Sequence, residues 1–219
     1  MISYTDIKND PAVRSYIKNA DKVLEALGYT EHSFAHCTAV AETAASILEG
    51  LGYPERDVEL TRIAGFMHDI GNVVNRVDHS QSGAIIAFRI LDKLGMDPDE
   101  ICKIVSAIGN HDEGTGVPVS DIAAALIIAD KSDVRRTRVR IGADREADIH
   151  DRVNYSVTSA KLGLDKNART LTLFIITDTE CGSIMDFFEI FLTRMKLCRS
   201  AADKLSLSFR LNINGREFI

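Results

Sequence analysis

Three separate segments of the sequence carry residue types that bind divalent metal ions. His36 lies in HCTAVAETAASILEGLG, the pair His68-Asp69 lies in AGFMHDIGN, and Asp130 lies in AALIIADKSD. Imidazole nitrogens together with carboxylates suit borderline or hard divalent ions, such as Mn, Fe, Co, Ni or Mg, better than a thiolate-rich structural zinc site does. A lone histidine on an apolar face is more often a core residue, so a metal site here requires that the three segments converge.

Each segment lies in a predicted helix, and two of them lie at its end. A helix is expected over residues 31–49 with Thr30 as its N-cap, a second over 55–69, and a very apolar one from Ser120 to Asp130. Adjacent histidine and aspartate side chains differ by about 100° around a helix. Both can reach one ion that lies near the helix terminus.

Helical spacing of apolar residues continues up to about residue 163, which predicts that the first part of the chain is nearly all α. A helix over 12–27 should end at Gly28. Residues 97–100, Asp-Pro-Asp-Glu, carry an N-cap acid, a proline at the first helical position and a glutamate placed for a capping box, so another helix should run from there to about Ile108.

After Asn167 the pattern changes to alternation. Residues 171–175 and 205–213 alternate apolar with polar side chains, as strands do, and a helix is expected between them over 183–199. Asn214-Gly215 could turn the chain into a short last strand.

The predicted fold is therefore mainly α, with a helical domain over residues 1–165 and a small β-α-β subdomain over 166–219. Two or three strands are marginally stable alone. We expect this sheet to pack on the helical domain or to form a homodimer with a second subunit.

Composition limits the classes of protein to which the chain can belong. It has 219 residues, 45% of them hydrophobic and 26% charged, and a formal net charge of -6. Non-specific nucleic-acid binding needs a broad basic surface and is not expected. The four cysteines lie far apart and form no CxxC pair. The longest apolar run, 122–129, is too short to cross a bilayer, so a cytoplasmic protein with no membrane partner is expected.

The ordered pattern H…HD…D resembles that of the HD-domain metal-dependent phosphohydrolases over roughly residues 30–135. The pair His68-Asp69 stands where the HDIG signature of that family has its own. The resemblance implies a helical HD domain that binds one or two divalent ions, with His68 and Asp69 in catalytic roles. The implied ligands in these segments are His36, His68, Asp69 and Asp130.

Two further histidines resemble ligands of the two-metal members of the family. His79 stands in DHSQSGA, similar to the family segment HxxxGA, and His111 stands in GNHDEGTGVP, similar to the HHE…DGTGYP stretch of HD-GYP cyclic-dinucleotide phosphodiesterases. The resemblance implies that Asp69 bridges two ions, with His79 and His111 on the second. The alternative is a site with one ion. In that site both histidines contact the metal-binding side chains without touching the ion, or they bind the phosphate of the substrate.

The sequence departs from the family pattern where Asn72 follows HDIG in place of a lysine. Asn110 replaces the first histidine of the tandem pair, and GTGVP replaces GTGYP. These changes, with the short segment between Asp69 and His79, argue against a cyclic-dinucleotide enzyme. The short spacing resembles that of the HD proteins that hydrolyse nucleotides or dinucleoside polyphosphates.

A basic run, KSDVRRTRVR, follows Asp130 directly and is a candidate phosphate-binding segment, because guanidinium groups pair bidentately with phosphate oxygens. A solvated charged loop is the alternative. Arg76, between the HD pair and His79, is a further candidate. The basic residues of the run are Lys131, Arg135, Arg136, Arg138 and Arg140.

Other candidate residues have weaker support. His32 lies one helical turn before His36, and His150-Asp151 is a second HD dipeptide, but neither has a counterpart in the family pattern, so both are expected at the surface or beside the ligands. Gly114 and Gly116 are expected to form a turn.

These residues predict hydrolysis of a phosphate ester or anhydride in a small nucleotide-like substrate, with a divalent metal as cofactor. One alternative is a phosphodiesterase for cyclic nucleotides or cyclic dinucleotides, which the GTGVP segment suggests. Another is a metal-containing sensor or interaction protein without catalysis, which Asn72, Asn110 and the C-terminal appendage suggest.

Overall fold

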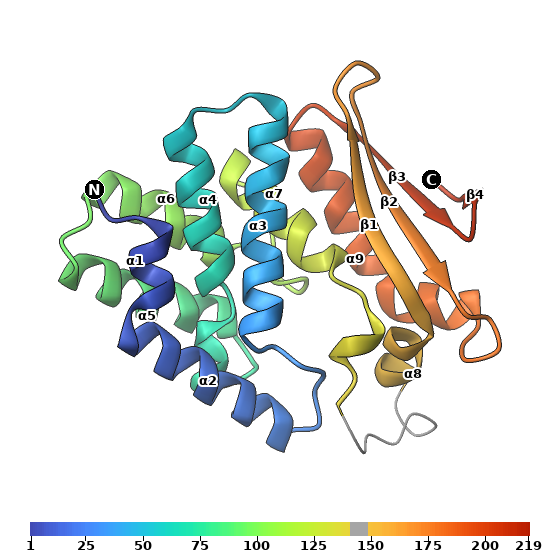
Figure 1. Ribbon diagram of the computed structural model, residues 1–219, viewed down its shortest axis with the longest axis horizontal. Coiled ribbons are helices and arrows are strands. Elements are labelled where there is room, and N and C mark those ends of the chain that lie inside the picture. The colour runs from blue at the N-terminus through green and yellow to red at the C-terminus, as the bar shows by residue number, and fades with distance from the viewer. Residues whose placement is uncertain (141–148) are drawn as a thin grey trace.

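In the computed structural model, which describes residues 1–140 and 149–219, a group of helices lies beside a small sheet (Figure 1). The sheet comprises β1 (Val157–Asp165), β2 (Thr170–Thr177), β3 (Ser208–Ile213) and β4 (Arg216–Glu217). The helices are α1 (Tyr4–Asn9), α2 (Pro11–Ala26), α3 (Phe34–Leu51), α4 (Glu55–Met67), α5 (His79–Lys93), α6 (Pro98–Gly109), α7 (Asp121–Ser132), α8 (Ile149–Ser156) and α9 (Ile184–Lys204), with 3-10 turns η1 (Ile70–Val73) and η2 (Arg136–Arg138).

Side-chain caps start several of these helices. The Ser120 hydroxyl accepts a hydrogen bond from the backbone N–H of Ala123, as predicted for α7. Asp97 caps α6 and Pro98 occupies its first position, which confirms that start signal. The predicted N-cap of α3 is wrong, because the helix begins at Phe34 and the hydroxyl of Ser33 caps it in place of Thr30.

Glu100 does not complete a capping box at the start of α6. Its carboxylate instead accepts a hydrogen bond from the Nε of Arg56, at 2.7 Å, and the two side chains form an ion pair. A guanidinium from α4 competes successfully for this carboxylate because it offers charge as well as two hydrogen bonds. The pair ties α6 to α4.

Helix α7 is the centre of the helical part. Residues 122–129 are all buried, and α7 packs against α3, α4, α6 and α9. A helix that is apolar on every side can exist in water only when neighbours cover it completely. Asp130, in the last turn of α7, is only partly buried, with its side chain 11% exposed. Among the described residues, no helix is long and apolar enough to span a membrane.

The four strands lie in the order β1-β2-β3-β4. β1 and β2 pair antiparallel, α9 connects β2 to its parallel neighbour β3, and β4 pairs antiparallel with β3. Leu171, Leu173 and Ile175 are buried on one face of β2, which confirms the predicted alternation. Asn214 and Gly215 both adopt positive φ in the turn to β4, as the sequence predicts.

Strand β1 corrects the prediction that helical structure continues to about residue 163. Ala160, Leu162 and Leu164 are spaced two apart and pack against the core from one face of a strand that pairs with β2. Pairing with β2, the other strand of the hairpin, prevails over a local pattern that is compatible with either period. The subdomain is thus β-β-α-β-β, and the predicted boundary at residue 165 falls at the end of β1, within the β1–β2 hairpin.

The predicted strand over 205–213 begins later than expected. Ser206 has a φ of 57°, and this left-handed conformation ends the regular alternation. Leu205 and Leu207 are buried in the turn that links α9 to β3. The strand starts at Ser208, where pairing with Thr170 begins.

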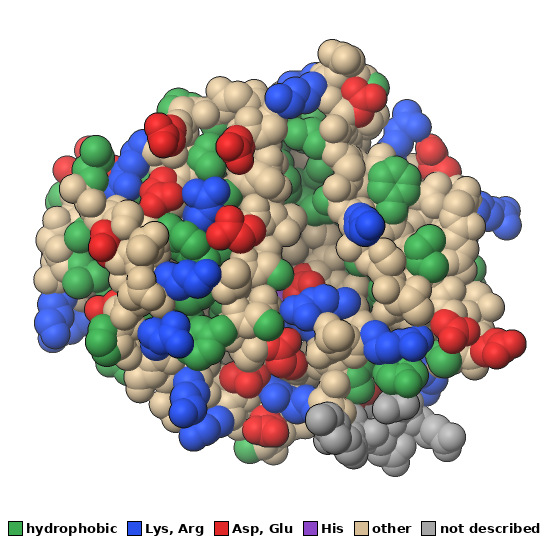
Figure 2. All heavy atoms as spheres, viewed as in Figure 1, with side chains coloured by type: hydrophobic (Ala, Val, Ile, Leu, Met, Phe, Trp, Pro, Cys, Tyr) green, Lys and Arg blue, Asp and Glu red, His purple; other side chains and the backbone are tan. Residues whose placement is uncertain are grey.

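The helical part and the sheet meet along α3 and β1. Figure 2 shows a hollow between them with apolar side chains inside it. A small cavity of about 80 Å³ lies there, lined by Ala39 and Thr43 of α3 and by Ala160 and Leu162 of β1, among others. α7 also contacts β1 and α9, so the sheet packs on the helical domain, as expected for so few strands.

Candidate metal centre

Three helices bring the first group of candidate ligands together. His36 comes from α3, His68 caps the end of α4, and Asp130 comes from the last turn of α7. The Nε2 atoms of His36 and His68 lie 3.3 Å apart. The Oδ1 of Asp130 lies 3.5 Å from the first and 3.6 Å from the second. The segments predicted to converge do so.

A second group lies on the other side of Asp69. His79 begins α5 and His111 follows α6, and their Nε2 atoms are 3.3 Å apart. The Oδ1 of Asp69 lies 3.4 Å from the Nε2 of His79. The Oδ2 of Asp69 lies 3.5 Å from the Nε2 of His36 and 3.3 Å from that of His68. The two oxygens of one carboxylate therefore face two different pairs of histidines.

The four histidines are oriented in the same way. His68, His79 and His111 each donate Nδ1–H to the backbone carbonyl three residues earlier, and His36 donates Nδ1–H to the carboxylate of Asp133 at 2.7 Å. A carbonyl or carboxylate oxygen can only accept, so the ring proton must lie on Nδ1. The Nε2 atoms are left to bind positive charge in the centre, the usual arrangement of metal-binding histidines.

These atoms fit a divalent cation. One ligand atom from each of His36, His68 and Asp130 lies within 4.8 Å of the others, and the same holds for His68, Asp69 and His111. The Oδ2 of Asp69 is buried, and no described residue donates a hydrogen bond to it. A buried carboxylate oxygen without a donor is costly unless a cation lies against it.

The charges in this cluster also favour a cation. Burial opposes protonation of His68, but the carboxylates of Asp69 and Asp130 overcome it and raise its pKa to about 10. Burial alone would raise the pKa of Asp69, yet the charge on His68 lowers it well below its usual range. The two carboxylates thus stay ionised and attract positive charge, either a proton on His68 or a metal ion in its place.

Asn72, which replaces the expected lysine, contributes to the site as a hydrogen-bond donor. Its Nδ2 donates to the Oδ1 of Asp69 at 3.0 Å and to the backbone carbonyl of the same residue at 2.9 Å. This contact fixes the plane of the central carboxylate. Asn72 thereby orients a candidate ligand.

The glycine of HDIG allows α5 to approach the HD pair. A Cβ on Gly71 would collide with the backbone carbonyl of His79 and the backbone N of Gly83. The free energy of unfolding of the Gly71→Ala variant should fall by about 3 kcal/mol, because the α5 backbone must move away from the added Cβ. Denaturant unfolding measures the change. Gly109→Ala, at a helical position with no Cβ contact closer than 3.7 Å, is the control and should be neutral or stabilising.

Asp133 was not identified as a site residue from the sequence, although it stands three residues after Asp130. We expect Asp133→Asn to weaken metal binding by roughly 10- to 100-fold, because the neutral amide no longer supports positive charge on the His36 ring. Competition with a chelating dye measures the affinity. Asp92→Asn, at an exposed position of α5, should keep wild-type affinity, and an unchanged affinity in Asp133→Asn would contradict the orienting role.

A cavity of about 340 Å³ opens onto the metal centre. Asp69, His79 and Asp130 reach it from the two groups of ligands, and four basic side chains from different elements also face it. The other lining residues come from the segment after α2, from α8 and from the loop after α6. The lining comprises Leu27, Gly28, Tyr29, Thr30, His32, Asp69, Arg76, His79, Glu113, Asp130, Lys131, Arg138, His150, Asp151, Asn154 and Arg194.

Three of the predicted phosphate-binding residues line this cavity, and each has a different partner within the protein. Lys131 is buried, and its Nζ donates to the Oδ2 of Asp130 at 2.6 Å. Arg138 is also buried and uses its guanidinium to hold the backbone carbonyls of Glu31 and Asp133. Arg76 lies beside the ligands, with its guanidinium 3.4 Å from the Nε2 of His79.

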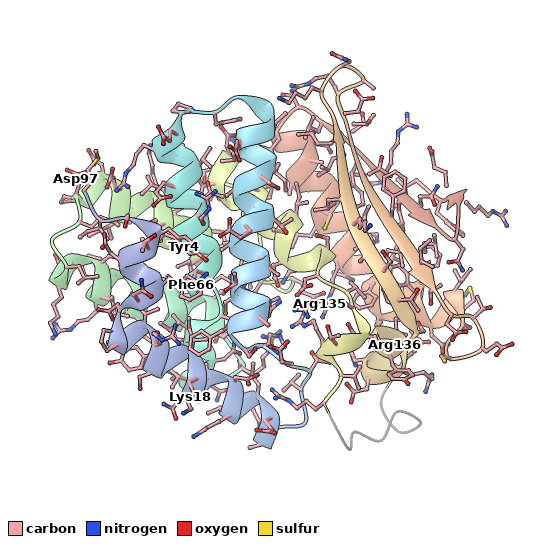
Figure 3. All side chains as sticks on the ribbon, viewed as in Figure 1. Tyr4, Lys18, Phe66, Asp97, Arg135 and Arg136 are labelled. Carbon is pink, nitrogen blue, oxygen red and sulfur yellow. The ribbon has the colours of Figure 1, made fainter. Side chains whose placement is uncertain are left out.

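The structure does not bring Arg135 and Arg136 to the cavity. Arg135 pairs with Asp133 at 2.8 Å, and the Nε of Arg136 donates to the backbone carbonyl of Tyr155 at 2.6 Å. Figure 3 places the first beside the lower end of α3 and the second beside α8. Arg140 pairs with Asp21 at 2.6 Å. All three arginines are thus paired with other groups of the protein, and none of them lines the cavity.

Three residues that the sequence placed among its weaker candidates, His32, His150 and Asp151, also line the cavity. The Nε2 of His32 lies 3.9 Å from the Oδ2 of Asp69, and burial lowers the pKa of this imidazole well below its usual value. His150 lines another wall. Glu113 and Arg194 were missed altogether, since no local pattern links two residues that lie far apart along the chain.

The chain is similar to known proteins. An uncharacterized protein of Methanocaldococcus jannaschii is 23% identical over 203 residues, which cover 82% of this chain and 77% of that protein. Ribonuclease Y of Cutibacterium acnes is 29% identical over 126 residues, which cover 53% of this chain but only 22% of the ribonuclease. A solved structure of a predicted HD superfamily hydrolase from an uncultured Thermotogales bacterium has a TM-score of 0.45 and 24% identity, over 57% of this chain and 67% of that one.

The HD domain family matches residues 33–143, about half of the chain. That match includes the helices that carry both groups of candidate ligands, from His36 to Asp130. The protein belongs to the HD domain family.

Proposed function

We propose that the protein is a divalent-metal-dependent phosphohydrolase that cleaves a phosphate ester or anhydride of a nucleotide-like substrate. One observation carries the proposal: Asp69 turns one oxygen toward each of two pairs of histidines, at a cavity that basic side chains also line. Carboxylate and imidazole ligands suit a hard or borderline cation, and basic side chains suit phosphate oxygens.

Each group of side chains has a part in this chemistry. A divalent ion supplies Lewis acidity, which lowers the pKa of water and neutralises negative charge on a phosphoryl group. His36, His68, Asp69 and Asp130 would hold one ion, and Asp69, His79 and His111 a second. His68 and Asp69 thus contribute to catalysis as ligands. Lys131 and Arg76, which lie next to these ligands, would donate hydrogen bonds to the phosphoryl oxygens and orient the substrate.

The direct test is a substrate panel with defined metals. Protein purified without chelator is analysed for Mn, Fe, Co, Ni and Mg, then loaded with each and offered nucleoside mono-, di- and triphosphates, dinucleoside polyphosphates and simple phosphomonoesters. Turnover of at least one linear compound with a bound metal supports the proposal. Absence of turnover across the panel with every metal would refute it.

The same panel separates the alternatives. Cyclic nucleotides and cyclic dinucleotides test the phosphodiesterase that the GTGVP segment suggests. A short RNA oligonucleotide is included because ribonuclease Y is among the relatives, although the net charge of -6 disfavours a polyanion. Tight binding of a nucleotide without turnover, with metal present, would favour a sensor.

The homodimer expected from the sequence stays a prediction. Phe174 and Ile176 on β2 are 45% and 49% exposed and would form the contact. We expect light scattering to show a dimer for the wild type and a monomer for Phe174→Glu, because a charge in an apolar interface costs several kcal/mol when unpaired. Lys18→Glu, at an exposed position of α2, serves as a charge control, and a monomeric wild type would contradict the prediction.

A further inference from the structure

Helix α9 carries one basic residue from the C-terminal subdomain into the cavity. α9 packs against α7, whose last turn holds Asp130. Arg194 of α9 lines the same cavity as Asp69 and Asp130. This residue lies outside the region that the HD domain family matches, which ends at residue 143.

The Arg194 side chain is held in place from two sides. Its Nε donates to the Oε1 of Glu113 at 2.7 Å, and its guanidinium lies 4.7 Å from the ring centroid of Phe191, which is fully buried. Glu113 belongs to the loop after α6, and a Cβ on Gly116 of that loop would lie 3.1 Å from Leu197 of α9. The loop and helix are thus in close contact, and the position of the guanidinium is set before any ligand binds.

The outer part of this guanidinium is available to a ligand. Among the described residues, none forms a hydrogen bond with its two terminal amino groups, and the side chain is 23% exposed. Arginine has five N–H donors, and only the one on Nε is used here. The terminal amino groups therefore present a fork that matches two oxygens of a phosphate.

The other basic side chains of the cavity already contact other groups of the protein. Arg138 holds two backbone carbonyls, and Lys131 and Arg76 lie against the metal ligands Asp130 and His79. Lys131 and Arg76 would donate hydrogen bonds to a phosphoryl group at the metal centre. Arg194, which comes from another element and is anchored to Glu113, adds a second point of positive charge.

We propose that Arg194 binds a second anionic group of the substrate, a phosphate beyond the one at the metal centre. This inference rests on the proposed function and narrows it to substrates with at least two linked phosphoryl groups. The C-terminal subdomain then determines specificity, because it completes the substrate site of the helical domain.

Equilibrium binding tests this inference without turnover. Calorimetric titration of the metal-loaded protein compares methylphosphonate with methylenediphosphonate, whose P–C–P linkage cannot be hydrolysed. We expect the wild type to bind the diphosphonate more tightly. Arg194→Gln should lose roughly 10-fold or more of that affinity, as for a lost hydrogen bond to a charged group, and keep its affinity for methylphosphonate within about twofold. Arg199→Gln, at an exposed position of the same helix, should match the wild type.

Two outcomes would overturn the inference: an equal loss for both ligands in Arg194→Gln, which indicates a structural role, or no loss for either. Arg194→Lys covers the case in which the glutamine variant does not fold, and it should also lose selectivity for the diphosphonate, since an ammonium group cannot bind two oxygens as a fork. Selective binding of the diphosphonate by a protein that hydrolyses nothing would refute the proposed function alone.

Discussion

Replacement of Asp69 by asparagine should lower kcat for the best substrate of the panel by on the order of 10³-fold, a loss typical of removing a central electrostatic contact from an active site. Asparagine keeps the shape of aspartate but has only one oxygen and no charge. The oxygen that faces His36 and His68 and the one that faces His79 cannot both be retained. Metal content measured on the same preparation should fall with activity.

The control for Asp69→Asn is the same change at an exposed acid of α5, Asp92→Asn. This variant should keep both its metal and its kcat. A far-ultraviolet circular dichroism spectrum identical to that of the wild type would show that Asp69→Asn is folded. If the folded Asp69→Asn variant kept full activity, the central role of this carboxylate would be wrong.

Removal of metal by a chelator should abolish turnover and lower the melting temperature. An ion present at about 100 times its dissociation constant stabilises the native state by about 2.7 kcal/mol. For a domain of this size, such a change shifts Tm by roughly 5–10 °C. Differential scanning calorimetry before and after chelation measures the shift, and addition of the native metal should restore both Tm and activity.

The site variants distinguish this stabilisation from a general effect of the chelator. Asp69→Asn should show little change of Tm with added metal, because it has lost the carboxylate shared by the two groups of ligands. Asp92→Asn should respond as the wild type does. A wild-type Tm that is the same with and without metal would be incompatible with a buried site that binds a cation tightly.

The helical part of the fold was largely predictable because its signals are local. Ser120, Asp97 and Pro98 act on backbone groups within a few residues, and the structure confirms the helices that they start. The failures arose where a residue or strand of another element provides the partner. β1 forms because β2 pairs with it, and Glu100 turns away from its own helix because Arg56 of α4 offers a better partner.

The candidate metal centre was predictable for a similar reason. Histidine and aspartate at the ends of apolar helices restrict the chemistry, and the H…HD…D order restricts the family. The residues around the ligands were not predictable to the same degree. Asp133 and Asn72 are recognisable as partners of His36 and Asp69 only when the helices have been placed in space.

By itself the sequence determined which residue types are available for metal and phosphate chemistry, together with the caps and apolar faces that build the helices. Tertiary structure alone decided which basic side chains line the cavity at the candidate metal centre. In one short basic run, Lys131 faces the cavity while Arg135 and Arg136 bind Asp133 and the Tyr155 backbone. Arg194 joins the site from α9, because packing, and not distance along the chain, determines which charges share a cavity.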